Sequence, residues 1–300
     1  MAEESYLVME AHSGRVLLAS NSESKRSIAS LTKVATAKVV LDWAKRSQTS
    51  LSTLVPVPQQ ALTLGALGSV NPMNLKPGDR LSMRDALYSM LLGSDNVAAY
   101  TLSDYVGRSL LAKRGVAGDP ESAFVKEMNN LAKALGMGKT KFTNAHGLGS
   151  SKKAGYSTAA DVARLSVYAM HDTGFTFYVK QKSRKVTVVN VNGGKSSFVV
   201  NNTNSLVGTQ GINGIKTGYS TEAGQCITVN SHRSALVKKI GEGQTQVRKR
   251  DLIVSILGST NREARAQQLI QQSWPLYDAW AAAGFQKSVD GKELILVPAL

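Results

Sequence analysis

The sequence predicts an α+β fold, an antiparallel sheet flanked by helices, with an all-helical lobe inserted between its strands. The chain opens on a hairpin pattern, in which residues 6–10 and 15–19 flank a turn-rich connector. Its middle carries helical apolar spacing, and its texture becomes strand-like after residue 174. Because strands at both ends enclose a helical middle, we expect the opening hairpin to join the later strands in one sheet.

The helices are predicted from apolar residues that recur with a period near 3.6. A largely buried helix is expected over residues 30–46, directly after a polar stretch at 21–26. Glycine, proline and asparagine separate the helices of the middle region, which are expected at residues 85–92, 97–106, 122–135 and 159–171.

The last third of the chain alternates in the manner of strands and then ends in a helix over about residues 261–283. The expected strands are residues 185–191, 197–201, 212–219, 225–231, 235–240 and 252–257. We therefore expect one domain over residues 1–283 in two lobes, with a tail at 284–300. The helical lobe would span about residues 60–172, the sheet lobe would hold residues 1–59 and 173–283, and a cleft would lie between them.

Composition limits the classes of protein that this chain can belong to. Its 300 residues are 42% hydrophobic, which suits a globular core, and no apolar run approaches the roughly 18 residues that span a bilayer. No signal or transit peptide opens the sequence, so any leader of an exported protein has been removed or lies outside it. The single cysteine, Cys226, excludes an intrachain disulfide and is expected to be a small buried apolar residue.

The net charge of +15 would attract polyanions. The densest basic cluster, residues 248–250, is short, lacks interleaved aromatic residues and belongs to no visible nucleic-acid module. We therefore expect a solvated basic face and no nucleic-acid partner. Peripheral association with an anionic cell envelope stays open.

Three short motifs carry the chemistry: Ser30-Leu31-Thr32-Lys33, Ser94-Asp95-Asn96 and Lys216-Thr217-Gly218. Each is common alone, but together and in this order they describe one catalytic centre. A serine three residues before a lysine shares a helix face with it, which brings an amine near a hydroxyl nucleophile. Ser30 also falls in the first helical turn, where free backbone amides favour developing negative charge.

With these motifs, the chain resembles the low-molecular-weight penicillin-binding proteins of the D-alanyl-D-alanine carboxypeptidase family, which share the fold of the serine β-lactamases. The stretches at 28–33, 135–137, 146–148 and 214–218 support the resemblance, which covers most of the chain. It implies a β-lactamase-like fold and a serine peptidase of the periplasm or cell envelope. The implied partners are peptidoglycan stem peptides that end in D-Ala-D-Ala, with β-lactams as covalent inhibitors.

The resemblance also implies roles for individual residues. Ser30 would attack the substrate carbonyl, and Lys33 would be its general base, with a pKa lowered by burial and by neighbouring cations such as Lys216. Ser94 would relay a proton to the departing amine. Asn96 would orient Lys33 and the substrate amide.

The third motif would bind the substrate. Lys216 and Thr217 would hold the terminal carboxylate, and Gly218 would let the strand backbone approach the substrate closely. The backbone amides of Ser30 and Tyr219 would form the oxyanion hole. Arg262 would either help to bind the terminal carboxylate or be an ordinary arginine of the helix surface.

Several functions remain to be separated. Carboxypeptidase activity is favoured over endopeptidase cleavage of cross-links because residues 214–218 and the Arg262 segment resemble that branch more closely. A β-lactamase is less expected, since Glu127 departs from the usual order of the deacylating glutamate and falls in a helix. A non-catalytic binding protein that uses its positive charge would not need the three motifs. No cofactor or metal is expected, because His12, His146, His171 and His232 do not form a ligand cluster.

Overall fold

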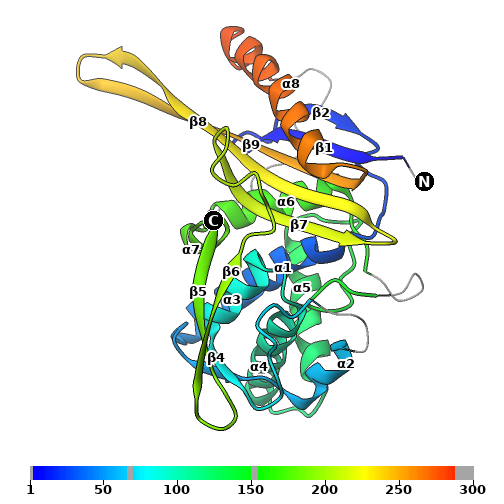
Figure 1. Cartoon of the computed structure of the whole chain (residues 1–300). Helices are drawn as coiled ribbons and strands as arrows, with labels where there is room; N and C mark the ends of the chain where they lie inside the picture. Colours follow the sequence, from blue (N-terminus) through cyan, green and yellow to red (C-terminus); the bar gives the residue numbers. More distant parts are fainter. Residues whose placement is uncertain (1–2, 66–69, 150–154, 288–300) are drawn as a thin grey trace.

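A five-stranded antiparallel sheet forms the upper half of the molecule in the computed structural model, which describes residues 3–65, 70–149 and 155–287 (Figure 1). The strand order is β2-β1-β9-β8-β7, so the opening hairpin joins the strands from the end of the chain. These strands are β1 (Ser5–Glu10), β2 (Val16–Ser20), β7 (Ile212–Ser220), β8 (Gly224–Gly241) and β9 (Gln244–Ser259). The predicted mixture of helices and antiparallel sheet is confirmed.

Both faces of this sheet are covered, which explains why its central strands are apolar at successive positions. On β1, Val8 packs against α8 (Arg262–Ala282), while its neighbours Leu7 and Met9 face the core that contains α1 (Thr32–Ser47) and α6 (Ala159–Met170). The core on the Val8 side of the sheet includes Trp274 and Tyr277 of α8. The helix that follows the nucleophile motif is therefore held between the sheet and the helical part of the molecule.

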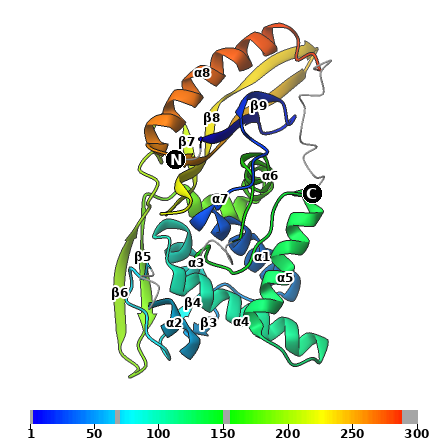
Figure 2. The same ribbon diagram turned by 90° about the vertical axis from the view of Figure 1, so that its right-hand side faces the viewer.

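The helical part contains further helices and several short elements (Figures 1 and 2). The helices α3 (Met83–Leu92) and α4 (Asn96–Arg114) are joined by the second motif, and α5 (Pro120–Ala134) packs beside α4. The shorter elements are η1 (Ala29–Leu31), η2 (Gln59–Ala61), α2 (Leu62–Gly65) and α7 (Thr173–Val179).

A second, four-stranded sheet corrects the predicted arrangement of strands. Its order is β3-β4-β5-β6, with β3 (Leu54–Pro56), β4 (Arg80–Ser82), β5 (Ser183–Val189) and β6 (Lys195–Asn201). The prediction placed β5 and β6 in the sheet lobe, but they pair with a strand from the helical region. The short strands β3 and β4, whose alternation is too brief to predict, provide the edge on which β5 pairs. The wider division into two lobes stays a prediction.

Two further differences concern lengths. The strands predicted at 225–231 and 235–240 are one strand, β8, and β9 begins eight residues before its predicted start at 252. The outer parts of both strands leave the body of the sheet as a two-stranded ribbon (Figure 1). Because most residues of this ribbon are exposed, its polar and apolar residues do not alternate regularly, and the sequence pattern falsely indicates that the strand ends after residue 231. Among the described residues, no helix combines the length and hydrophobicity needed to cross a bilayer.

Candidate active site

The nucleophile Ser30 lies in η1, the tight turn that leads into α1. Ala29, directly before it, has a φ of +44°, a backbone region that residues with a side chain seldom adopt. Ser30 itself is half-buried, whereas its neighbours Ala29 and Leu31 are buried. The turn therefore fixes the direction of the Ser30 hydroxyl while its neighbours anchor it in the core.

The Lys33 amine is buried next to that hydroxyl. Its Nζ lies 2.9 Å from Ser30 Oγ, 2.6 Å from Asn96 Oδ1 and 2.7 Å from the carbonyl oxygen of His146. The two carbonyl oxygens can only accept hydrogen bonds. In the neutral amine they would take both N–H groups, which leaves the nitrogen lone pair for the Ser30 hydroxyl.

Burial lowers the pKa of Lys33 from 10.5 to about 7, although the charge of the nearby Asp95 opposes this change. The predicted direction is confirmed, and burial is its main cause. The expected repulsion between cations is instead seen at Lys216, whose pKa is lowered first by burial, then by Lys33 and then by Arg262.

The second motif forms the connection between α3 and α4. Asp95 caps α4 by accepting a hydrogen bond from the Ala98 amide (3.0 Å) and also accepts one from Ser89 Oγ (2.8 Å). These contacts place Asn96 at the first helical position, where its amide oxygen reaches Lys33. Ser94 is half-buried with a φ of +60°, so its backbone is strained in the way often found at functional sites.

Asp95 is a residue of the site to which the sequence prediction gave no role. Its carboxyl is fully buried, and burial raises its pKa from 3.8 to about 6 against the effect of its hydrogen bonds. Its position inside the second motif was the available signal, but the burial of its side chain depends on tertiary packing.

The third motif lies on β7, the strand at the end of the sheet. Lys216 and Thr217 are both buried, and Lys216 Nζ donates to the carbonyl oxygen of Thr217 (3.1 Å). The hydroxyl of Thr217 lies 2.6 Å from that of Thr203, which comes from the loop after β6. Thr203 was missed by sequence reasoning because no motif surrounds it.

Two glycines hold the nucleophile turn from opposite sides. A β-carbon at Gly218 would lie 2.9 Å from the Ile28 carbonyl oxygen and 3.2 Å from the Ser30 amide nitrogen. A β-carbon at Gly147, whose φ is +86°, would lie 2.0 Å from the Ala29 carbonyl oxygen. The close approach expected at Gly218 thus includes the turn itself, and the His-Gly-Leu stretch supports the turn from the other side.

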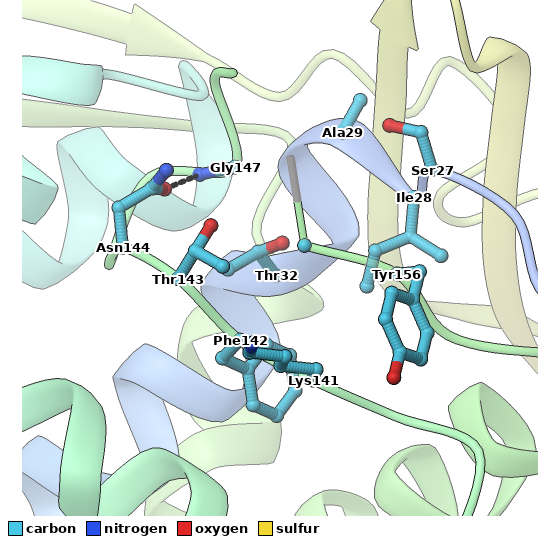
Figure 3. A pocket seen from close by; sticks show the side chains of 11 residues that line it. Ser27, Ile28, Ala29, Thr32, Lys141, Phe142, Thr143, Asn144, Gly147 and Tyr156 are labelled. Carbon is cyan, nitrogen blue, oxygen red and sulfur yellow. Dashed lines mark hydrogen bonds between the residues drawn. The ribbon is translucent and has the colours of Figure 1, made fainter. Parts of the chain in front are cut away.

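Figure 3 shows the loop that contains Asn144 and Gly147 beside Ala29 of the nucleophile turn. The Asn144 side chain accepts a hydrogen bond from the Gly147 amide (2.6 Å), which ties the loop into a compact turn beside η1. A cavity of only about 10 Å³ separates the loop from residues 27–32. Since that volume holds at most about one water molecule, the turn has little room to move backwards.

We predict that Gly147→Ala moves the nucleophile turn. The contact with Ala29 should cost about 1–3 kcal/mol beyond the backbone strain and lower the rate of Ser30 acylation about 10²-fold. Gly136→Ala is the matched control, because Gly136 has a φ of +69° but no atom within 4 Å of its β-carbon position. Thermal unfolding and acylation by a penicillin would be measured for both variants. Equal behaviour of the two would contradict the proposed contact.

Arg262 and Tyr219 lie beside the third motif. Arg262 Nη1 donates to the Gly218 carbonyl oxygen (2.9 Å), and its Nε donates to Glu263 (2.8 Å). The guanidinium is therefore next to the third motif and not on a remote helix surface, while its role toward a carboxylate stays a prediction. Tyr219 is 67% exposed, and the role of its amide in an oxyanion hole is also untested.

One of the four histidines, His146, lies beside Lys33, and the other three lie together around Asp251. The imidazole of His146 is buried, and burial, with Lys33 as a lesser cause, lowers its pKa to about 3. His12 and His232 both contact Asp251, at 2.8 Å and 3.0 Å, and His171 stacks on His12. Within the described residues no group of three or more His, Cys, Asp or Glu side chains could hold a metal ion. Cys226 is buried, as expected.

Glu127 is not part of this site. It lies on α5, where its carboxylate pairs with Arg114 of α4 at 2.6 Å. This position agrees with the helical assignment and gives no support to a role as the deacylating glutamate.

Comparison with known proteins indicates the same family as the three motifs. A family model described as D-alanyl-D-alanine carboxypeptidase matches residues 1–238. A D-alanyl-D-alanine carboxypeptidase of Escherichia coli is 33% identical over 223 residues, which is 73% of this chain and 50% of the relative. A D-alanyl-D-alanine endopeptidase of Haemophilus influenzae is 30% identical over 77% of this chain and 71% of the relative. The chain spans about half the length of the first relatives, which include a Bacillus subtilis carboxypeptidase.

Solved structures give a similar result. A mutant of a Streptomyces DD-transpeptidase superposes with a TM-score of 0.76 at 27% identity, over 90% of this chain and 97% of that one. A penicillin-binding protein of Listeria monocytogenes with ampicillin bound superposes with a TM-score of 0.68 at 26% identity, over 90% and 96% of the two chains. The superpositions confirm the predicted β-lactamase-like fold class.

Proposed function

The chain belongs to the D-alanyl-D-alanine carboxypeptidase family, and from that premise we propose that it is a serine-type D-alanyl-D-alanine carboxypeptidase acting on peptidoglycan stem peptides. The observation that carries the proposal is the contact of 2.9 Å between Lys33 Nζ and Ser30 Oγ, with two carbonyl oxygens holding the amine. A buried amine with a pKa of about 7 is neutral in a large fraction of molecules near neutral pH. A non-catalytic binding protein would have no need of such an arrangement.

Acylation would begin when neutral Lys33 takes the proton of the Ser30 hydroxyl. Ser30 Oγ then bonds to the carbonyl carbon of the penultimate D-alanine, and the carbonyl oxygen gains the negative charge. The amides of Ser30 and Tyr219 would stabilise that charge in the oxyanion hole. Asn96 keeps the amine in place, because its side-chain oxygen accepts from Lys33.

Departure of the terminal D-alanine would complete the acyl-enzyme. The proton on Lys33 would pass through the hydroxyl of Ser94 to the amine nitrogen as the C–N bond breaks. A water molecule then gives a proton to Lys33 and attacks the ester carbon. As the ester bond breaks, Lys33 returns that proton to Ser30 Oγ, so the shortened peptide is released and the Ser30 hydroxyl is restored. Ser94 and Asn96 flank Asp95, the residue that caps α4, which supports a joint role.

The terminal carboxylate would bind beside β7. Lys216, Arg262 and the Thr217 hydroxyl supply two cations and a donor next to the nucleophile turn. The lowered pKa of Lys216 follows from its burial near other cations. A bound carboxylate would offset this repulsion, and the Thr203 hydroxyl would orient that of Thr217.

We predict that Arg262→Gln weakens recognition of the substrate carboxylate. The ratio kcat/KM for a peptide ending in D-Ala-D-Ala should fall about 10-fold or more, since a charge-assisted hydrogen bond is lost. A peptide with an amidated terminus should be affected little. Arg265→Gln is the control, because Arg265 lies on the same helix but pairs with Glu4. An equal loss for both peptides would show that Arg262 acts only through the structure of the site.

The endopeptidase is the second candidate, because a relative of that name is similar over most of this chain. Incubation with a stem pentapeptide and with a cross-linked peptide dimer, followed by chromatography, tests both activities. Release of D-alanine from the pentapeptide is the expected result. Cleavage of the dimer without release of D-alanine would overturn the carboxypeptidase assignment.

We further propose that β-lactams acylate Ser30 and remain bound. The ampicillin complex of the Listeria monocytogenes protein supports this binding, and the pairing of Glu127 with Arg114 argues against a β-lactamase. Intact-mass spectrometry after addition of a penicillin should show one stable adduct, whereas rapid turnover without an adduct would indicate a lactamase.

The substrate also bears on location. Stem peptides lie outside the cytoplasmic membrane, so the protein would work in the periplasm or cell envelope. Its net charge of +15 supports association with anionic components there.

A further inference from the structure

The ribbon formed by the outer parts of β8 and β9, residues 233–250, leaves the body of the protein and is here called the arm (Figure 1). Ser231, close to its base, is fully buried, and residues 236–247 are all exposed. At about 3.3 Å per residue, the ten residues from Ser231 to the turn at Gly241 reach roughly 30 Å. The catalytic groups lie on η1, α1, β7 and the connection between α3 and α4, so the peptidase site does not explain this projection.

One face of the arm joins aliphatic side chains to cations. Val237 and Val247 are directly opposite each other across the two strands and are 67% and 63% exposed. Lys239 and Lys249 follow two residues later on the same face, because side chains alternate along a strand. Scattered exposed apolar residues are ordinary, but a cross-strand pair of them on a projecting ribbon is not.

The other face of the arm is already occupied. Arg248 lies opposite Leu236, and its guanidinium stacks on Phe285 with 3.6 Å to the ring centroid. At the base, Arg233 and Arg250 pair with Asp278 of α8. The end of α8 therefore supports one face, and the face with Val237 and Val247 points away from it.

The charge of the arm identifies a class of partner. Between residues 233 and 250 the sequence has six lysines and arginines against one acid, Glu242. Within the described residues no hydrogen bond or ion pair engages the ammonium groups of Lys238, Lys239 or Lys249. Two copies of such an arm would repel each other, and lysines along a ribbon disfavour edge pairing. A soluble polyanion would match the cations but leave the aliphatic side chains in water.

We propose that the arm docks the protein on an anionic phospholipid bilayer, with Val237 and Val247 entering the headgroup region and Lys239 and Lys249 pairing with lipid phosphates. An anionic bilayer would accept the aliphatic side chains of the arm and attract its cations at the same time. The inference deepens the envelope association proposed above and does not depend on the peptidase chemistry.

Sedimentation with vesicles tests the proposal on the whole chain. We expect binding to vesicles of phosphatidylcholine that contain about 30 mol% phosphatidylglycerol, and weak binding to phosphatidylcholine alone. Val237→Ser with Val247→Ser, and separately Lys239→Gln with Lys249→Gln, should each lower the apparent affinity about 10-fold. These side chains are exposed, so thermal unfolding should not change, and acylation by a penicillin should remain normal.

Matched controls lie on the β5–β6 hairpin. Val191→Ser with Val199→Ser removes two exposed valines (74% and 66%), and Lys185→Gln with Lys195→Gln removes two exposed lysines. Neither pair should alter vesicle binding. Equal losses in the arm and control variants would reduce the effect to general surface charge and overturn the proposal, as would unchanged binding of the valine variant of the arm.

A fluorescent label gives a second, independent measurement. Cys226 is the only cysteine and is fully buried, so a polarity-sensitive maleimide dye on Val237→Cys reports on that position. Its emission should shift to the blue on anionic vesicles, while the same dye on Val199→Cys should not shift. Equal emission with and without vesicles at Val237→Cys would show that the arm stays in water. Loss of peptidase activity alone would affect neither measurement.

Discussion

Ser30→Ala should abolish both peptidase activity and covalent binding of penicillin. The variant keeps the Lys33 amine but lacks the Ser30 hydroxyl, the nucleophile whose oxygen lies 2.9 Å from that amine. Loss of the nucleophile of a hydrolase that works through an acyl-enzyme typically costs about 10⁴–10⁶ in kcat. Release of D-alanine from a pentapeptide and the intact mass after addition of penicillin would measure the two effects.

A suitable control for this substitution is Ser24→Ala. Ser24 is exposed in the polar turn before the motif, so its hydroxyl should not matter. Unfolding temperatures of both variants should remain close to that of the wild type, because the half-buried Ser30 side chain fills little space in the core. A Ser30→Ala protein that still forms a stable adduct would contradict the assignment of the nucleophile.

The acylation rate should rise with pH and level off above about 7. Lys33 must be neutral to accept the proton, and burial lowers its pKa to about 7. Well below that pH, the fraction of neutral amine falls about tenfold for each unit. Stopped-flow measurement of penicillin acylation between pH 5 and 9 would give the profile, and a rate independent of pH over this range would contradict Lys33 as the base.

Lys33→Arg should lower acylation about 10²–10⁴-fold, because a guanidinium stays protonated and cannot act as a base. Its loss should not be recovered at pH 9. Lys38→Arg is the matched control on the same helix: Lys38 is also buried, but it pairs with Asp42 and Asp172, and its pKa is raised. An arginine there keeps the charge that these carboxylates require, so acylation should change little.

The sequence was sufficient to predict the groups that meet at the site wherever a motif or a helical period relates them. The spacing of Ser30 and Lys33 places them one turn apart where η1 continues into α1, so their contact needs little tertiary information. The meeting of Lys33 with Asn96, 63 residues later, could be expected only from the resemblance of the three motifs to a family. The roles of Ser94, Tyr219 and Arg262 remain predictions.

Other features depended on packing between distant segments. Thr203 meets Thr217 because a loop after β6 returns to β7, and Gly147 meets Ala29 across more than a hundred residues of chain. No local pattern marks either contact. The pairing of β5 with β4 was missed for a related reason, since a three-residue strand such as β4 is too short to show alternation.

The place of β7 in its sheet has a consequence for substrate recognition. The described sheet ends at β7, so one side of this strand has no neighbouring strand to satisfy its backbone groups. An extended peptide laid along that side could be read through its main chain, as in β-augmentation, without regard to most of its side chains. Selectivity would then come from the ends of the ligand and from the handedness of its alanines, which suits a polymer of variable composition.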